Sequence, residues 1–136
     1  MALVIGNSDY RGAPLVNPRN DARAMGALLQ QAGFRTDSLF DTTQQQMAMA
    51  VERFGQAIRD PAVKFGLFYY AGHGLQMDWR NYLVPVSANI RTPADVRQQT
   101  VDVSQLLRTM EDAKGRSFLV ILDACRDDPF GDAFRP

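Results

Sequence analysis

The chain has very few of the side chains that build structural zinc sites and disulfides. Its 136 residues include one cysteine, Cys125, and one histidine, His73. One cysteine excludes an intrachain disulfide, and this pair is too small for the usual structural zinc site. We therefore predict no metal and no cofactor. A reducing compartment fits this cysteine usage, so the cytoplasm is favoured for this segment.

Long apolar runs and an excess of charge are also missing. The apolar run at residues 1–6 is too short for a membrane span or a signal-peptide core, and no basic flank precedes it. The 15 basic residues cancel the 15 acidic ones, so no net field would attract nucleic acid or an anionic membrane. We predict no nucleic-acid partner and no membrane contact for this segment.

What the sequence does contain is an alternation of apolar strands with amphipathic helices. At 46% hydrophobic content, the chain suffices for one domain with a core of its own. Apolar runs predict strands, and apolar residues three or four positions apart predict helices. Strands are expected at 2–5, 34–40, 65–71 and 118–122, with a short strand or hairpin arm at 82–86. Helices are expected at 21–32 and 103–113. A further helix is expected to begin with a capping box at 41–46 and to end at residue 58.

This order of elements predicts an α/β fold: a three-layer α/β/α sandwich around a mainly parallel sheet. The runs at 65–71 and 118–122 are apolar on both faces, which is typical of central parallel strands.

The single histidine and the single cysteine each follow one of these two central strands. His73 stands between Gly72 and Gly74, where we expect the first strand to end, and Cys125 lies shortly after the second. Ligands of open α/β sheets bind at the carboxyl ends of strands, so the two residues can meet in one crevice. Taken alone, each fits a histidine in a turn or a small buried cysteine. Their joint placement favours a catalytic dyad, in which imidazole raises the thiolate fraction of the cysteine.

The residues around this pair resemble a known family. Tyr-Tyr-Ala-Gly-His-Gly at 69–74 resembles the histidine motif of caspase-like cysteine peptidases, and Leu-Asp-Ala-Cys-Arg at 122–126 resembles their cysteine motif. His73 precedes Cys125 by about 50 residues, as in caspases. Segments 2–7, 15–22 and 82–86 extend the resemblance, to bacterial metacaspase-like and paracaspase-like proteins, over nearly the whole chain. The resemblance implies a cysteine endopeptidase with His73 as general base and Cys125 as nucleophile.

Two departures from true caspases indicate the metacaspase and paracaspase branch. Asp123 stands two residues before Cys125, and Asp127 replaces the glycine of the caspase motif. In that branch the resemblance implies that Asp123 and Asp21 line a pocket for a basic P1 side chain. The expected substrate is then a peptide or protein cleaved after Arg or Lys. Asp21 is explained equally well as a residue that stabilises a helix start.

The resemblance also assigns an oxyanion hole. The backbone N–H groups of Gly74 and Cys125 would stabilise the tetrahedral intermediate. Alternatively, Gly72 and Gly74 only permit a tight turn, and both explanations can hold together.

The extent of the chain suggests a fragment of a longer protein. It ends at Pro136, soon after Cys125, so residues 1–136 are interpreted as the large, p20-like part of a caspase-like domain. The C-terminal small-subunit strands, a p10-like segment, would be missing, and the open sheet edge could pair with that segment or with a second copy.

Two other functions remain as alternatives. One is a catalytically silent caspase-like interaction module of a larger protein, which is disfavoured because both catalytic residues are present. The other is a flavodoxin-like ligand-binding domain, disfavoured because the turn at 6–9 lacks the glycines and lysine of a phosphate loop. The acidic residues Asp127, Asp128 and Asp132 are interpreted as a solvated loop, and calcium dependence is not predicted.

Overall fold

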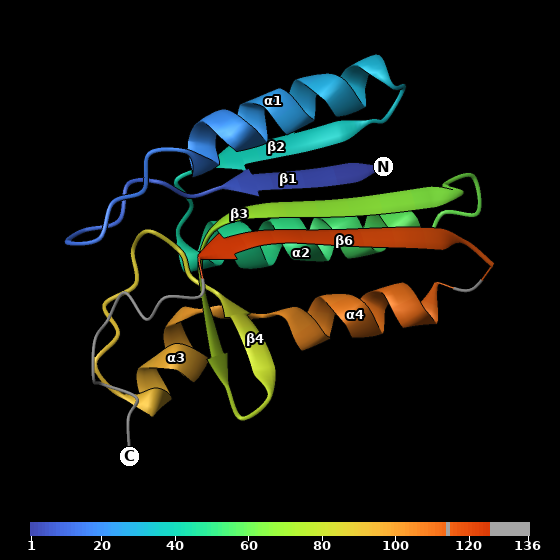
Figure 1. Cartoon of the computed structure of the whole chain (residues 1–136). Coiled ribbons are helices and arrows are strands. Elements are labelled where there is room, and N and C mark those ends of the chain that lie inside the picture. The colour runs from blue at the N-terminus through green and yellow to red at the C-terminus, as the bar shows by residue number, and fades with distance from the viewer. Residues whose placement is uncertain (114, 126–136) are drawn as a thin grey trace.

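Strands and helices alternate along residues 1–113 and 115–125, the part of the chain that the computed structural model describes (Figure 1). The strands are β1 (Ala2–Gly6), β2 (Thr36–Phe40), β3 (Phe65–Met77), β4 (Arg80–Leu83), β5 (Val101–Asp102) and β6 (Ser117–Cys125). The helices are α1 (Pro18–Gln31), α2 (Gln44–Ile58), α3 (Pro93–Gln99) and α4 (Val103–Asp112).

The sheet has a parallel main part and an antiparallel extension. Strands β2, β1, β3 and β6 lie side by side in that order, and all three pairings are parallel. The last residues of β3 leave this part and pair antiparallel with β4, which in turn pairs with β5. The prediction of a mainly parallel sheet is confirmed.

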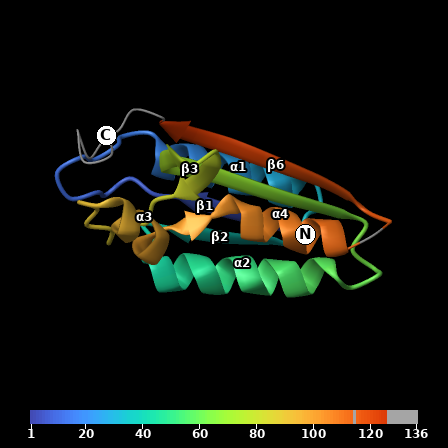
Figure 2. The same cartoon turned by 90° about the horizontal axis from the view of Figure 1, so that it is seen from below.

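Helices cover both faces of the parallel part, as Figure 2 shows edge-on. On one face, α1 packs Ala22 and Leu29 into a cluster with Tyr69 of β3. On the other face, Phe54 of α2 packs into a cluster with Tyr70 of β3 and with residues of α4. The predicted three-layer α/β/α arrangement is confirmed, and helices bury both faces of the central strands β1 and β3.

Helix boundaries follow local signals that the sequence carries. The capping box predicted for α2 is present, with Thr43 and Gln46 exchanging side-chain and backbone hydrogen bonds. Helix α1 begins at Pro18, three residues before the predicted start, because proline fits the first helical position. Helix α3 and strand β5 were not predicted. The signals for α3 were Pro93 at its first turn and a capping box from Thr92 to Asp95.

The predicted end of the central strand at residue 71 is wrong. Strand β3 continues to Met77, because residues 74–77 find hydrogen-bonding partners in β4. A tight turn at Asp78 and Trp79, with φ of 51° and 65°, joins the two strands, and Trp79 is 93% exposed at its tip. The hairpin arm expected at 82–86 is found at 80–83, and Pro85 follows it.

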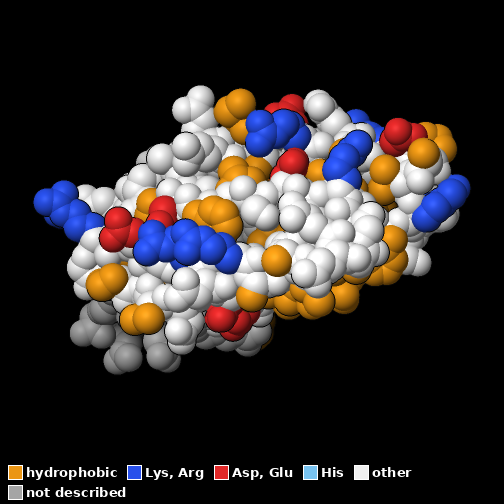
Figure 3. All heavy atoms as spheres, turned by 90° about the horizontal axis from the view of Figure 1, so that it is seen from above, with side chains coloured by type: hydrophobic (Ala, Val, Ile, Leu, Met, Phe, Trp, Pro, Cys, Tyr) orange, Lys and Arg blue, Asp and Glu red, His pale blue; other side chains and the backbone are white. Residues whose placement is uncertain are grey.

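Charges of both signs are interspersed on the face that α1 covers. Figure 3 looks onto this face and shows Lys and Arg side chains among Asp and Glu side chains. Among the described residues, no helix is both long and apolar enough to cross a membrane.

Candidate functional site

His73 and Cys125 are register partners in adjacent parallel strands. His73 of β3 lies opposite Cys125, the last residue of β6. The sequence placed His73 in a turn beyond its strand, but it lies inside β3, at the point where the parallel pairing ends and the hairpin begins. Backbone pairing is all that the structure describes of Cys125. The two residues, which were predicted to follow their strands, therefore lie within two paired strands.

The His73 imidazole is buried and oriented by a backbone carbonyl. Its Nε2 lies 2.8 Å from the carbonyl oxygen of Ala13, in the loop between β1 and α1, and the residue is 5% exposed. Since a carbonyl can only accept, Nε2 carries the hydrogen of the neutral ring, and Nδ1 is then the basic nitrogen. The ring of Tyr10 packs on the imidazole at 4.4 Å between centroids.

Buried hydroxyl groups hold the backbone of His73. Its N–H donates to the Tyr10 hydroxyl at 3.0 Å, and its carbonyl accepts from the Tyr70 hydroxyl at 2.7 Å and from the Val84 N–H at 3.1 Å. Tyr10 in turn donates to the carbonyl of Val84 at 2.7 Å, and the two hydroxyls lie 3.1 Å apart. Both polar backbone groups of His73, the N–H and the carbonyl, are thus hydrogen-bonded inside the protein. These bonds fix the position of the backbone from which the imidazole extends.

Burial keeps these two tyrosines neutral. It raises the pKa of Tyr10 from 10.0 to about 12, against the opposing hydrogen bonds from Tyr70 and His73. Burial and the neighbouring Tyr10 also raise the pKa of Tyr70 well above 10.0. Both groups therefore act as hydroxyl donors throughout the neutral range.

The structure brings Asp21 and Asp123 toward one hydroxyl group. Asp21 lies in the first turn of α1, Asp123 lies near the end of β6, and both are exposed. The Tyr69 hydroxyl lies 3.5 Å from Oδ2 of Asp123. Burial first, and then the charges of Asp123 and Asp21, raise the pKa of Tyr69 to about 12. Two carboxylates from distant parts of the sequence therefore act on the same small region.

Gly74 lies where β3 and β6 approach closely. A Cβ added at Gly74 would be 3.0 Å from the Cβ of Ala124, so a larger residue would push the two strands apart. Its neighbour Gly72 has even less room, because an added Cβ would lie 2.6 Å and 2.7 Å from the hydroxyls of Tyr70 and Tyr10. The absence of a side chain at both glycines therefore permits close packing around His73, in addition to the backbone freedom that glycine provides.

Sequence reasoning missed three contributors to this site. Tyr70 was considered only as part of the histidine motif and Tyr10 was given no role, because the aromatic type gave no hint that these hydroxyls would bind the histidine backbone. Ala13 carried no signal at all, because it contributes through its carbonyl, which every residue has.

No metal site is found in the described part of the chain. No group of three or more His, Cys, Asp or Glu side chains there could hold an ion. The acidic residues Asp127, Asp128 and Asp132 lie outside the described residues.

One edge of the parallel sheet is uncovered within the described residues. Strand β6 pairs there with β3 alone, and its Leu119 and Leu122 are 44% and 38% exposed. Apolar side chains on an unpaired edge form a surface that a further strand can cover.

Comparison with known proteins gives a family and a fold. The model of the caspase domain family, peptidase family C14, matches residues 1–135. The human mucosa-associated lymphoid tissue lymphoma translocation protein 1 is 36% identical over 128 residues, and its mouse homologue is 35% identical. Each alignment covers 93% of this chain but 15% of the relative. A crystal structure of a Geobacter sulfurreducens protein has a similar fold, with TM-score 0.62 and 18% identity over 92% of this chain and 50% of that one.

Proposed function

Because the chain belongs to the caspase domain family, we propose that it is a cysteine endopeptidase that uses His73 and Cys125 and cleaves after Arg or Lys. One observation carries this proposal: the only histidine and the only cysteine are register partners at the end of adjacent parallel strands. Neighbouring strands lie about 4.8 Å apart, so this register places the backbones of a candidate base and a candidate nucleophile side by side.

In the proposed first step, His73 activates the cysteine. The Ala13 carbonyl holds the hydrogen on Nε2, so Nδ1 is the nitrogen that accepts the thiol proton of Cys125. The thiolate then attacks the carbonyl carbon of the scissile peptide bond.

The remaining steps return the enzyme to its starting state. The N–H groups of Gly74 and Cys125 would donate to the oxyanion, and the imidazolium would give its proton to the leaving amine. Water, deprotonated by His73, would hydrolyse the thioester and restore the thiol.

Basic P1 selectivity is supported by the two carboxylates near Tyr69. The charges of Asp21 and Asp123 both act on the Tyr69 hydroxyl, and Asp123 lies two residues before Cys125 in β6. A guanidinium or ammonium group is attracted there, whereas an acidic P1 side chain is repelled.

The dyad can be tested without a substrate, by alkylation of the single cysteine. Iodoacetamide should label Cys125 faster in the wild type than in His73→Ala across neutral pH, because the variant lacks the base that raises the thiolate fraction. Far-UV circular dichroism checks that the variant is folded. Equal rates in two folded proteins would contradict the dyad.

The P1 pocket is tested with fluorogenic peptides. Asp123→Asn should lower kcat/KM for an Arg peptide by roughly ten- to a hundredfold, the effect of losing a charge-assisted pair of about 1.5–3 kcal/mol. Asp112→Asn, which removes an exposed carboxylate from α4, is the matched control and should leave the value unchanged. A preserved Arg preference in Asp123→Asn, or an Asp preference in the wild type, would refute the pocket.

The peptide assays should compare this chain alone with the same chain extended beyond Pro136. The exposed leucines of β6 support the proposal that a further segment pairs with this edge. Without that segment, small displacements of the strand that carries Cys125 would lower the activity of the protein. Cys125→Ala is the blank. Equal activity with and without the extension would show that the edge needs no such partner.

A further inference from the structure

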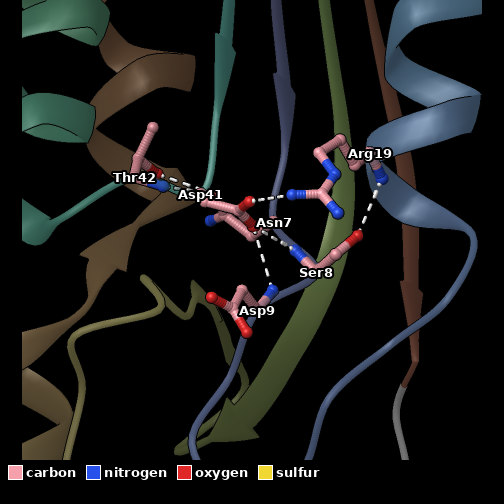
Figure 4. Close-up of polar contacts among 6 residues, drawn as sticks. All are labelled: Asn7, Ser8, Asp9, Arg19, Asp41 and Thr42. Atoms are coloured by element: carbon pink, nitrogen blue, oxygen red, sulfur yellow. Dashed lines mark hydrogen bonds and ion pairs between the residues drawn. The ribbon is translucent and has the colours of Figure 1, made fainter.

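Asp41, the residue that follows β2, is tied by two hydrogen bonds to the β1–α1 loop and by a third to the first turn of α1. Figure 4 shows its carboxylate between the start of the β1–α1 loop and Arg19 of α1. Oδ1 accepts from the N–H groups of Ser8 at 2.8 Å and Asp9 at 2.9 Å, and Oδ2 accepts from Nη1 of Arg19 at 2.8 Å. The backbone of Asp41 is left-handed, with φ of 51°, a conformation that aspartate tolerates better than most residues.

The bonds to Asp41 are charge-assisted. Partial burial would raise the pKa of Asp41, but the Ser8 and Asp9 N–H groups and the Arg19 charge outweigh it and lower the pKa below 3.8. The carboxylate is therefore charged at neutral pH, and such hydrogen bonds are about twice as strong as neutral ones.

Ser8, held by Asp41, closes the loop on itself. The Ser8 carbonyl accepts from the N–H of Tyr10 at 3.0 Å and from the N–H of Leu15 at 2.8 Å. The Ser8 hydroxyl oxygen accepts from the N–H of Arg19, in the first turn of α1, at 2.9 Å. One residue thus fixes both ends of the segment 8–15.

This segment carries the two groups that orient the histidine. Tyr10 packs its ring on the imidazole and accepts from the His73 N–H, and Ala13 binds Nε2 through its carbonyl. Without the bonds to Asp41, Ser8 and Asp9 would lose an anchor to the end of β2, and the Ala13 carbonyl could shift relative to Nε2.

We propose that Asp41 is a positioning residue for His73: its carboxylate fixes the segment 8–15, and the segment presents the Ala13 carbonyl that selects the Nε2–H tautomer. The catalytic consequence rests on the proposed function, whereas the effect on the tautomer does not. Asp41 would control which nitrogen of the imidazole is the base without touching the substrate.

The fold itself does not depend on the carboxylate of Asp41. The side-chain oxygen of Asn7 accepts from the N–H and the hydroxyl of Thr42, each at 2.9 Å, and the Asn7 N–H donates to the Ala71 carbonyl at 2.9 Å. These bonds keep the ends of β1, β2 and β3 together when the carboxylate is removed. A variant of Asp41 should therefore fold with a displaced loop.

The experiment compares graded changes at Asp41 with a matched control. Asp41→Gly removes the carboxylate and tolerates the left-handed backbone, whereas Asp41→Asn keeps an oxygen acceptor but loses the charge. Asp102 is the control, because its carboxylate also accepts from a backbone N–H, that of Ser104, and from an arginine, Arg80, but it holds α4 to β4. Asp102→Gly should leave His73 unchanged.

Since His73 is the only histidine, the ¹⁵N NMR spectrum of the imidazole reports on one ring. The wild type and Asp102→Gly should show the Nε2–H tautomer, Asp41→Gly a mixture of both tautomers, and Asp41→Asn an intermediate state. On an Arg peptide, Asp41→Gly should lower kcat about 10- to 100-fold with KM unchanged, because the substrate pocket is not altered.

The outcomes separate this proposal from the proposed function. An unchanged tautomer in folded Asp41→Gly would overturn the positioning role, whether or not the wild type cleaves peptides. A tautomer mixture in Asp41→Gly, with a wild type that stays inactive even when extended beyond Pro136, would support the positioning role and refute the peptidase assignment.

Discussion

Neighbouring tyrosines on β3 face opposite sides of the sheet and have different surroundings. Tyr70 faces α2 and α4, and its hydroxyl contacts the carbonyls of His73 and Val84 and the hydroxyl of Tyr10. Tyr69 faces α1, and its hydroxyl has one long contact, to the carboxylate of Asp123. Residues of one type, adjacent in the chain, therefore belong to different parts of the candidate site.

The difference indicates how the site divides its tasks. The hydroxyls on the Tyr70 side are buried and multiply bonded, so they hold the His73 backbone in place without a ligand. The Tyr69 side, with two exposed carboxylates and the uncovered edge of β6, keeps polar groups available for a ligand. Positioning and recognition would lie on opposite faces of one strand.

The largest effect expected from this comparison is alkaline destabilisation through the buried hydroxyls. The pKa of Tyr10 is raised from 10.0 to about 12, so the unfolded chain loses this proton at lower pH than the folded one. The stabilisation is complete below pH 10 and is lost as pH rises through 12, about 2–3 kcal/mol from Tyr10 alone. Urea unfolding at several pH values should show a steeper decline for wild type than for Tyr10→Phe, and parallel declines would contradict it.

At neutral pH, Tyr10→Phe should have the largest effect among the hydroxyl deletions. It leaves the buried His73 N–H without its acceptor, which costs about 1–3 kcal/mol of unfolding free energy. The control is Tyr82→Phe, since the structure gives no hydrogen bond for that hydroxyl among the described residues. Similar losses in both variants would mean that the hydroxyl of Tyr10 has no special role.

Tyr70→Phe should cost less, about 0.5–1.5 kcal/mol. The carbonyl of His73 would keep its bond from the Val84 N–H, and the carbonyl of Val84 would keep its bond from Tyr10. Chemical denaturation of Tyr70→Phe and Tyr10→Phe side by side measures the order. A larger loss for Tyr70→Phe would show that the network is centred on Tyr70.

Tyr69→Phe should have the smallest effect, within about 0.5 kcal/mol of wild type. Its hydroxyl has a single weak contact near a solvated carboxylate, so water can replace it. The same denaturation experiment provides the number. A loss as large as that of Tyr10→Phe would remove the distinction between the two faces.

Much of the fold could be predicted because its signals are local. The capping box of α2, the fully apolar strands and the motifs around His73 and Cys125 depend on residues near one another in the sequence. The predicted end of β3 was wrong because Gly72 and Gly74 indicate a turn locally, whereas the partner strand β4 keeps that segment extended. Helix α3 was overlooked although its proline and capping box were present.

The sequence by itself determined the alternation of strands and helices, the family resemblance and the identity of the candidate base and nucleophile, since side-chain chemistry and periodicity are properties of short segments. Only the tertiary structure decided that the Ala13 carbonyl binds Nε2 and that Tyr10 and Tyr70 hold the backbone of His73. It also decided that Asp41 binds the start of the segment 8–15, which carries Tyr10 and Ala13. Every residue except proline offers the same backbone N–H and carbonyl. Which of them meets the histidine depends on how distant elements pack.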